Sequence, residues 1–292
     1  ISECLVGSEM CIRDRYRLIC IDMDGTLLSS KGEVTNENKE ALQKAQEEGV
    51  SIVITTGRIY QCAKGFNKQI GINGPIISSN GTYIGLPDEV EPFYHKGLTY
   101  DEVMTFYKCA KKYPIEIHFS TTKGILCDVR VKATEDYHNK LNEMLPEEER
   151  FEIAYVEDFD DVFETYDGQI LKAFCMSMEE KDALAKLKGE LIALDLYEVS
   201  SSGGDNIEVM PKGVDKGYGV SKLAEHLNIP KEAVICIGDN ENDLSMIEYA
   251  GMGIAMGNST PEVLEKADDI TLTNDESGVA KAIQKYIFNL SE

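Results

Sequence analysis

Short apolar runs alternate with amphipathic stretches from residue 16 to about residue 85. Three of these runs are rich in isoleucine and valine and predict buried strands: 17–21, 50–56 and 75–79. Helices are predicted between them at 36–48 and 58–70, with Thr35 as a suitable N-cap and Gly49 as a suitable stop for the first helix. Buried strands joined by helices of this length predict βαβ units and a parallel sheet.

Apolar and polar positions alternate along the middle of the chain, from residue 86 to residue 205. This pattern predicts four strands, at 115–120, 124–130, 169–176 and 196–201. Helices are predicted between the strands at 99–113, 135–145 and 179–193. Alternation is typical of an antiparallel sheet with one covered face, so we predict a separate α+β domain here. The acidic run 146–164 is interpreted as a solvated face.

The α/β pattern returns after residue 205. The predicted elements are a helix at 216–228, a strand at 233–237, a helix at 242–250, short strands at 253–256 and 269–273, and a helix at 278–288. The predicted fold is therefore α/β, with a Rossmann-like parallel-sheet core made from residues 16–85 and 206–292. Residues 86–205 form an α+β cap domain inserted into that core. Residues 1–15 fit neither pattern, and we expect a disordered leader that is not native to the protein.

Amino-acid composition and net charge disfavour some classes of binding partner. The 292 residues include 52 Asp and Glu against 29 Lys and Arg, which gives a net charge of −23. This charge repels a phosphate backbone and disfavours nucleic-acid binding. No window approaches the ~18 apolar residues of a membrane span. Of the eight cysteines, Cys20, Cys175 and Cys236 lie in predicted buried strands, and no pair has C-x-x-C spacing, so reduced thiols in a cytoplasmic protein are expected.

Two carboxylates stand directly after the first predicted strand, in the segment Asp22-Met-Asp-Gly-Thr26. Parallel α/β sheets bind ligands at this end of their strands. Asp22 can attack phosphorus, and Asp24 can protonate the leaving oxygen and later accept a proton from water. Gly25 permits an unusual backbone bend, and Thr26 can hydrogen-bond to hold the loop. The alternative is an Asx-type turn, for which Asp-Gly is a common signal.

Two later segments supply groups for a phosphate. Thr56 ends the second predicted strand, and Gly57 begins the segment that leads into a helix, so a hydroxyl and free amides are available there. Lys216 begins another predicted helix and can contact both the nucleophile and a phosphoryl group. Lys212 is a rival for that role.

A further acidic segment, Gly238-Asp-Asn-Glu-Asn-Asp243, again follows an apolar strand and precedes a helix. Its carboxylates, Asp239 and Asp243, can join Asp22 and the backbone carbonyl of Asp24 around a hard cation. A small set of protein oxygens completed by water and phosphate is typical of Mg²⁺.

The order of these motifs resembles the haloacid dehalogenase superfamily and in particular its Cof-type (subfamily IIB) phosphatases, whose α/β cap is inserted between the second and third motifs. The segments 80–81 and 208–216 also match that pattern. The resemblance covers nearly all of the chain from Tyr16 onward. It implies that Asp22 is nucleophile and magnesium ligand, Asp24 is acid/base and carbonyl ligand, Asp239 is the third protein ligand, Asp243 supports the metal shell, and Thr56, Gly57, Lys216 and Asn242 hold phosphate.

The predicted function is Mg²⁺-dependent hydrolysis of small phosphorylated metabolites, such as sugar phosphates or phosphorylated cofactors, through an aspartyl-phosphate intermediate. A phosphomutase and a non-catalytic metabolite binder are the alternatives. The sequence makes no prediction about the oligomeric state. Four histidines (His95, His118, His138 and His226) show no metal-ligand spacing, and ordinary polar or half-buried roles are expected for them, although His118 lies in a predicted cap strand and can face a substrate.

Overall fold

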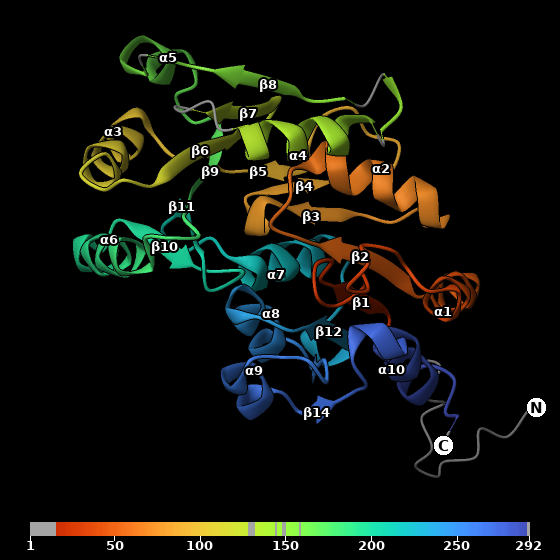
Figure 1. Ribbon diagram of the computed structural model, residues 1–292. Helices are drawn as coiled ribbons and strands as arrows, with labels where there is room; N and C mark the ends of the chain where they lie inside the picture. The colour runs from red at the N-terminus through yellow and green to blue at the C-terminus, as the bar shows by residue number, and fades with distance from the viewer. Residues whose placement is uncertain (1–15, 128–131, 144, 148–149, 158, 291–292) are drawn as a thin grey trace, which may run out of the picture.

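Two sheets organise the chain, as Figure 1 shows. The computed structural model describes residues 16–127, 132–143, 145–147, 150–157 and 159–290. The predicted leader, residues 1–15, lies outside the described residues, as do positions 128–130 of one predicted strand. The mixed α/β fold with a parallel sheet is confirmed.

The larger sheet has eight strands in the order β14-β13-β12-β1-β2-β3-β4-β5. Their bounds are β1 Leu18–Ile21, β2 Ser51–Thr55, β3 Ile76–Ser78, β4 Tyr83–Gly85, β5 Tyr94–His95, β12 Val234–Gly238, β13 Met252–Ala255 and β14 Asp269–Ile270. The pairs from β14 to β3 are parallel, and β4 and β5 are added antiparallel at one edge. Successive parallel strands are joined through helices, as the sequence pattern predicts.

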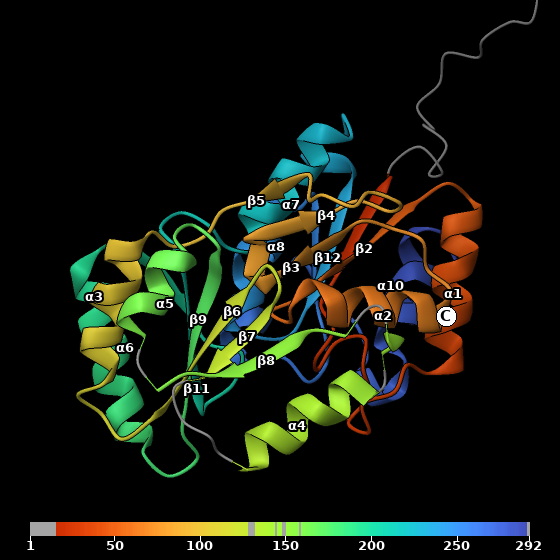
Figure 2. The same ribbon diagram turned by 90° about the horizontal axis from the view of Figure 1, so that it is seen from above.

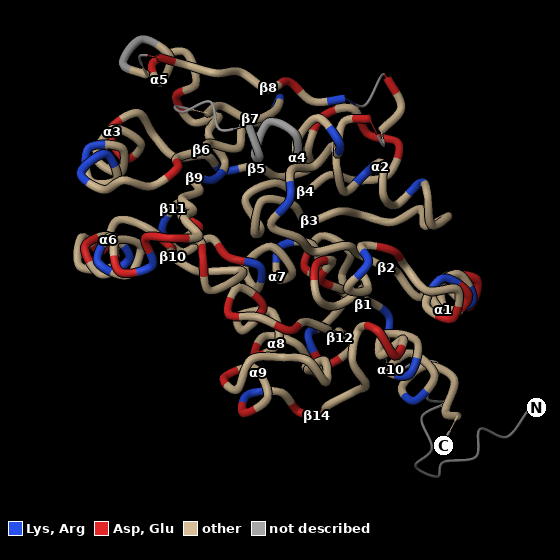
Figure 3. Tube along the Cα trace, viewed as in Figure 1, with Lys and Arg blue, Asp and Glu red and all other residues tan. Residues whose placement is uncertain are grey.

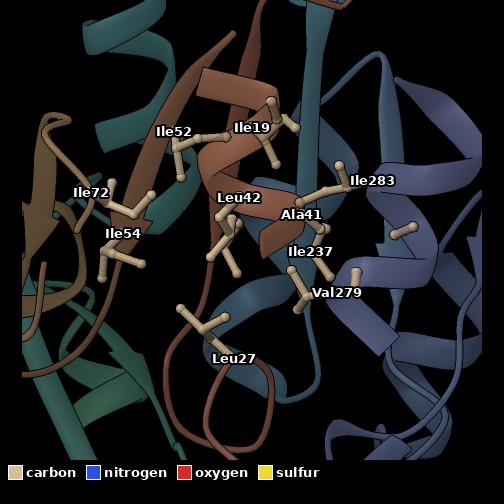
Figure 4. Packing of buried hydrophobic residues seen from close by; sticks show 14 of the residues in the cluster. Ile19, Leu27, Ala41, Leu42, Ile52, Ile54, Ile72, Ile237, Val279 and Ile283 are labelled. Atoms are coloured by element: carbon tan, nitrogen blue, oxygen red, sulfur yellow. The ribbon is translucent and has the colours of Figure 1, made fainter. Parts of the chain in front are cut away.

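Helices cover both faces of this sheet. They are α1 Asn36–Glu47, α2 Tyr60–Ile70, α7 Lys216–His226, α8 Leu244–Tyr249, α9 Pro261–Lys266 and α10 Gly278–Tyr286. On one face, Ile19 and Ile21 of β1 pack with residues of α1, α2 and α10, and Figure 4 shows part of this cluster around Leu42 and Ile237. On the other face, Leu18 and Cys20 pack against α7 and α8. Strand β1 is thus completely buried, which explains its unbroken apolar sequence.

The smaller sheet, which we call the cap sheet, has six strands in the order β10-β11-β9-β6-β7-β8. Their bounds are β6 Glu116–Thr121, β7 Gly124–Cys127, β8 Glu152–Tyr155, β9 Ile170–Met176, β10 Tyr197–Ser200 and β11 Asn206–Pro211. The strands pair antiparallel, except for β7 and β8, which are parallel.

Three helices of the cap pack on one face of the cap sheet, and a fourth, α4 (Lys132–Glu143), lies on the other side. Helices α3 (Tyr100–Ala110), α5 (Asp160–Thr165) and α6 (Lys181–Leu194) pack on the first face around Phe119 and Phe163. Figure 2 shows these helices on one side of β9, β6 and β7, with the larger sheet on the other side. The second face of the cap sheet is turned toward the larger sheet and is partly covered by α4, where Leu141 packs with Ile125 of β7 and Ile153 of β8.

Some elements differ from the sequence predictions. The acidic run 146–164 is not simply a solvated face, because β8 and α5 lie within it and Phe159 and Phe163 are fully buried. The many Asp and Glu residues in this run obscure the pattern of the apolar positions between them in the sequence. Strands β4, β5 and β11 and helix α9 were also missed, since short elements carry little periodicity. Residues 94–95 pair with the larger sheet and 206–211 with the cap sheet, so we propose domain boundaries near residues 96 and 212.

Charged residues of both signs are interspersed over the helices and loops, as Figure 3 shows. The central strands β1, β2 and β12 carry none, in agreement with their burial. Among the described helices, none is long and apolar enough to cross a membrane. The described cysteines are free thiols, and Cys20, Cys175 and Cys236 are buried as predicted.

Candidate active site

The sequence motifs meet at the carboxyl edge of β1 and β12. These strands are parallel neighbours, with Ile21 opposite Ile237, so the residues that follow each strand emerge side by side. The backbone N–H of Asp22 continues the pairing by donating to the carbonyl of Ile237 at 3.0 Å. Asp239 follows β12 at the same edge. Carboxylates more than two hundred residues apart in the sequence therefore lie together at this edge of the sheet.

Lys216 links two of these carboxylates. Its Nζ donates to Asp22 Oδ1 and to Asp243 Oδ1, each at 2.6 Å. Lys216 has no exposed surface. Burial opposes its positive charge, but the two carboxylates outweigh this effect and raise the pKa of Lys216 above its ordinary value. The rival candidate Lys212 lies elsewhere, because its exposed side chain pairs with Asp195 at 2.7 Å.

The loop after β1 is held against the loop after β12. Thr26 Oγ1 donates to Asp239 Oδ1 at 2.7 Å, so its hydroxyl bonds to another motif rather than to its own loop. Gly25 has a φ of 86°, which confirms the predicted bend. A side chain at position 25 would also meet Asp239, since an added Cβ would lie 2.4 Å from Oδ2. Glycine is required here for two independent reasons.

The carboxylates of Asp22, Asp239 and Asp243 form a compact buried cluster. One oxygen of each lies within 4.8 Å of the others. Asp243 is also fixed by its second oxygen, which accepts from the backbone N–H groups of Asp239 and Asn240 at 2.9 and 3.0 Å. This geometry makes the cluster rigid, and a rigid set of hard oxygen donors fits Mg²⁺.

Electrostatics supports the same conclusion about a cation. Burial and the neighbouring carboxylates raise the pKa of Asp22 well above its ordinary value, although Lys216 opposes the shift. Burial and Asp243 raise the pKa of Asp239 to about 7. Three buried carboxylates thus share one buried ammonium group, which leaves excess negative charge. A divalent cation would compensate for it.

Asp24 lies at the mouth of this cluster, with a side chain that is 57% exposed. Arg58 holds it through two hydrogen bonds, from Nε to Oδ2 at 2.8 Å and from Nη2 to Oδ1 at 2.5 Å. A bidentate pair of this kind orients the carboxylate. The sequence analysis assigned Arg58 no role, and only its position after Thr56-Gly57 could have indicated one.

The predicted phosphate-binding residues also lie at this edge. Thr56 is buried, and its hydroxyl accepts from the backbone N–H of Arg58 at 3.1 Å. Asn242 donates through Nδ2 to Asn80 Oδ1 at 3.4 Å. Gly57 lies against the same asparagine, because a Cβ added to this glycine would be 3.1 Å from Asn80 Oδ1. Asn80 itself has a φ of 56°, a left-handed conformation that asparagine tolerates better than most residues.

A buried ion pair from the cap sheet joins this network. Lys172 of β9 pairs with Glu208 of β11, and both side chains are buried. Lys172 Nζ also donates to the carbonyl of Gly57 at 2.7 Å, and Glu208 Oε2 accepts from Asn80 Nδ2 at 3.0 Å. Although burial raises it, the pair with Lys172 holds the pKa of Glu208 below its usual value. The cap sheet thereby contacts the backbone of a predicted phosphate-binding residue.

We expect Glu208→Gln to lower the free energy of unfolding by about 3 kcal/mol, because it leaves Lys172 buried without a countercharge. Urea denaturation at neutral pH measures this change. Glu190→Gln is the matched control, since Glu190 forms an exposed pair with Lys112. Its effect on the free energy of unfolding should be much smaller, because water screens an exposed pair. Equal effects of the two substitutions would show that the Lys172–Glu208 pair has no special role.

A cavity of about 540 Å³ opens above the carboxylates. Asp22, Asp24 and Gly57 line it from the larger-sheet side, and the second face of the cap sheet together with α4 lines it from the other side. His118 is among the cap residues that face this cavity, as the sequence analysis allowed. His138 also lines it, which the sequence analysis did not anticipate.

Comparisons with known proteins agree with this architecture. A sequence profile described as haloacid dehalogenase-like hydrolase matches residues 19–283. Phosphatase YwpJ of Bacillus subtilis is 32% identical over 93% of this chain and 100% of its own length. The 5-amino-6-(5-phospho-D-ribitylamino)uracil phosphatase YcsE of the same organism is 30% identical over 93% of this chain and 96% of its own. The structure of a haloacid dehalogenase-like hydrolase from B. subtilis superimposes with a TM-score of 0.81, at 29% identity, over 92% of this chain and 99% of the other.

Proposed function

The chain belongs to the haloacid dehalogenase-like hydrolases, and from this premise we propose that it is a magnesium-dependent phosphatase of small phosphorylated metabolites. Membership confirms the superfamily resemblance stated from the motifs. The relatives compared above are named phosphatases, which supports phosphoric monoester hydrolysis as the reaction. The observation that carries the proposal is the position of Asp22, which is bonded to Lys216, adjacent to two further carboxylates, and open to the cavity.

In the proposed mechanism, Asp22 is the nucleophile. One of its oxygens is held by Lys216 Nζ, so the orientation of the carboxylate is set before substrate binds. Attack by a carboxylate oxygen on phosphorus forms an aspartyl phosphate and releases the alcohol. Water then attacks the phosphorus and regenerates Asp22 with release of inorganic phosphate. Lys216 also stabilises the negative charge of the transferring group.

Asp24 is the proposed acid and base. Its exposed carboxylate lies two residues from the nucleophile and lines the same cavity. It donates a proton to the leaving alcohol and recovers one from the attacking water. The bidentate pair with Arg58 holds the carboxylate in position at the cavity.

Asp22, Asp239 and Asp243 are the side chains proposed to hold or support Mg²⁺, with the backbone carbonyl of Asp24 as a further ligand. When bound, the cation neutralises the repulsion between the carboxylates and an incoming phosphate. Thr56, Gly57 and Asn242 are the proposed phosphate ligands, together with Lys216. The location of this set beneath the cap sheet favours small soluble esters over phosphorylated proteins, because the cavity is bounded on both sides. The cap residues exclude bulk water from the first step.

We also propose that the protein acts in the cytoplasm. Support comes from the free thiols among its described cysteines, since a reducing compartment keeps thiols in this state. The net charge of −23 argues against nucleic acid as a partner.

The metal requirement gives the direct test. We expect EDTA to abolish release of inorganic phosphate from p-nitrophenyl phosphate and added Mg²⁺ to restore it. Mg²⁺ at a hundredfold excess over its Kd should stabilise the protein by about 2.7 kcal/mol, as measured by thermal or chemical unfolding. Asp239→Asn should remove most of this stabilisation and lower kcat at least about a hundredfold.

Asp101→Asn is the control for this substitution, because Asp101 is exposed in the first turn of α3. It should retain both the stabilisation by Mg²⁺ and the activity. A protein that hydrolyses phosphate esters equally well in EDTA would contradict the metal assignment. With a sugar 1-phosphate as substrate, an isomerised sugar phosphate in place of inorganic phosphate would identify a mutase.

A further inference from the structure

The face of the cap sheet that lines the cavity carries large apolar side chains along β9. Along β9, Lys172, Phe174 and Met176 line the cavity, whereas Ala173 and Cys175 pack against the helices on the other face. This is the period-two alternation of a strand with two different environments. Phe174 and Met176 follow Lys172 by two and four positions, and they add apolar surface close to the phosphate-binding network.

Neighbouring strands extend this surface. Phe174 pairs with His118 of β6 on one side and with Glu208 of β11 on the other. Its ring centroid lies 6.3 Å from that of His118 and 5.6 Å from Lys172 Nζ. Phe174 therefore occupies the centre of the cap side of the cavity, directly beside the ion pair that contacts Gly57.

The wall next to the cap sheet is also apolar. Ile59 and Cys62, at the start of α2, form a buried cluster with Phe151, and Ile125 and Leu141 pack against it. All five side chains line the cavity. The site therefore presents phenylalanine and aliphatic surface on two sides of the space above Asp22 and Asp24.

The lysine and arginine side chains in the described cavity wall are paired with carboxylates, and two further carboxylates, Glu116 and Asp205, also line it. The basic side chains that line it, Arg58 and Lys172, pair with Asp24 and Glu208 respectively. Glu116 adds a carboxylate near His118, at 3.4 Å from its Nε2. A second anionic group on a substrate would meet this carboxylate and would have to break an existing ion pair to find a cation.

From this wall we propose that the substrate is a phosphate monoester whose alcohol part carries an uncharged aromatic or heteroaromatic ring, rather than a sugar or a second acidic group. Flat rings gain from contact with phenylalanine and thioether side chains. Sugar hydroxyls would lose water where they meet this apolar surface, and polar groups of the same cavity, such as His118, Ser120 and Asn206, would compensate only those hydroxyls that reach them. The inference rests on the proposed phosphatase function and selects among its substrates.

Three esters with the same ring–CH₂–O–phosphate linkage test the proposal: benzyl phosphate, glucose 6-phosphate and 4-carboxybenzyl phosphate. Each releases a primary alcohol, so differences in kcat/KM report recognition of the ring. We expect benzyl phosphate to exceed glucose 6-phosphate by at least about tenfold, and the added carboxylate to lower kcat/KM by a similar factor. A preference for glucose 6-phosphate or for 4-carboxybenzyl phosphate would overturn the inference.

Phe174→Ala links the preference to the cap sheet. It should lower kcat/KM for benzyl phosphate about tenfold, mainly through KM, and change the value for glucose 6-phosphate less than about threefold. Ile192→Ala, at a position 56% exposed on α6, is the control and should change neither value. Phe174→Leu, which keeps most of the apolar volume, should retain more of the preference and guards against an effect of misfolding. Equal losses for both esters in Phe174→Ala would contradict a role in ring recognition.

The outcomes separate the inference from the function on which it rests. Hydrolysis of p-nitrophenyl phosphate, with its activated leaving group, reports the chemistry of the Asp22 site. If that ester is cleaved but the sugar ester is preferred over benzyl phosphate, only the inference fails. If none of the esters is cleaved in the presence of Mg²⁺, the proposed function fails and the inference fails with it.

Discussion

Replacement of Asp22 with asparagine should lower kcat by about five orders of magnitude, as removal of the nucleophile does in other covalent mechanisms. The amide is nearly isosteric with the carboxylate, so the position of the side chain is preserved while its ability to form an acyl phosphate is lost. Turnover of p-nitrophenyl phosphate with Mg²⁺ present measures the change. Residual activity above about one per cent of the original would show that Asp22 is not the nucleophile.

The same substitution should leave the protein folded and should not destabilise it in the absence of metal. The pKa of Asp22 is raised in the folded state, chiefly by burial, so its ionised form costs stability at pH values above the unfolded pKa. An uncharged asparagine avoids that cost but also gives up the interaction with Lys216. Because the raised pKa shows that the unfavourable effects outweigh Lys216, we expect Asp22→Asn to have an equal or higher Tm in EDTA. A clear decrease in Tm would contradict this electrostatic account.

Replacement of Lys216 with methionine should damage both stability and activity. Lys216 is completely buried and joins Asp22 to Asp243 through two short hydrogen bonds. Without its ammonium group, two buried carboxylates repel each other in a medium of low polarity. We expect a loss of about 3–5 kcal/mol in the free energy of unfolding in EDTA, because removal of one partner leaves buried charge uncompensated. The lysine charge would also no longer stabilise the transferring phosphoryl group, which should lower kcat by about 10²–10³.

Lys212→Met is the matched control, since the sequence alone left Lys212 as a rival and the structure places it in an exposed pair with Asp195. Its unfolding free energy should change far less than that of Lys216→Met, and its kcat should be unaffected. Urea denaturation and steady-state kinetics of both variants complete the test. If Lys212→Met were the more damaging change, the assignment of the catalytic lysine would be wrong.

The central elements could be predicted because their signals are local. Strand β1 is a continuous apolar run, and the N-cap predicted at Thr35 is present, with its side chain accepting from the N–H of Asn38. The bend at Gly25 follows from the absence of a Cβ, which the residue type alone makes known. Each of these features depends on a few consecutive residues, so the sequence carries the full information.

Other features had no local signal. The acidic residues around β8 and α5 masked a buried pair of phenylalanines, Phe159 and Phe163, whose rings contact Tyr107 of α3 and Phe119 of β6. Lys172 looks like any lysine in a half-buried strand. Its contact with the carbonyl of Gly57 exists only because the cap sheet lies against the larger sheet. Contacts between residues far apart in the sequence depend on the topology of the fold, and the periodicity of the sequence does not reveal them.

The α/β class, the order of the motifs and the candidate chemistry of Asp22, Asp24 and Asp239 can be inferred from the amino-acid sequence. The three-dimensional arrangement is needed to learn which lysine meets Asp22, that Arg58 holds Asp24, and that Phe174 rather than Cys175 faces the cavity. Residue type limits the chemistry that a side chain can perform. The neighbours of that side chain, and the polarity of its environment, are set by the register of the strands and by the packing of the two sheets. A period of two separates the faces of β9, but the helices that cover one face decide which of them is left for a ligand.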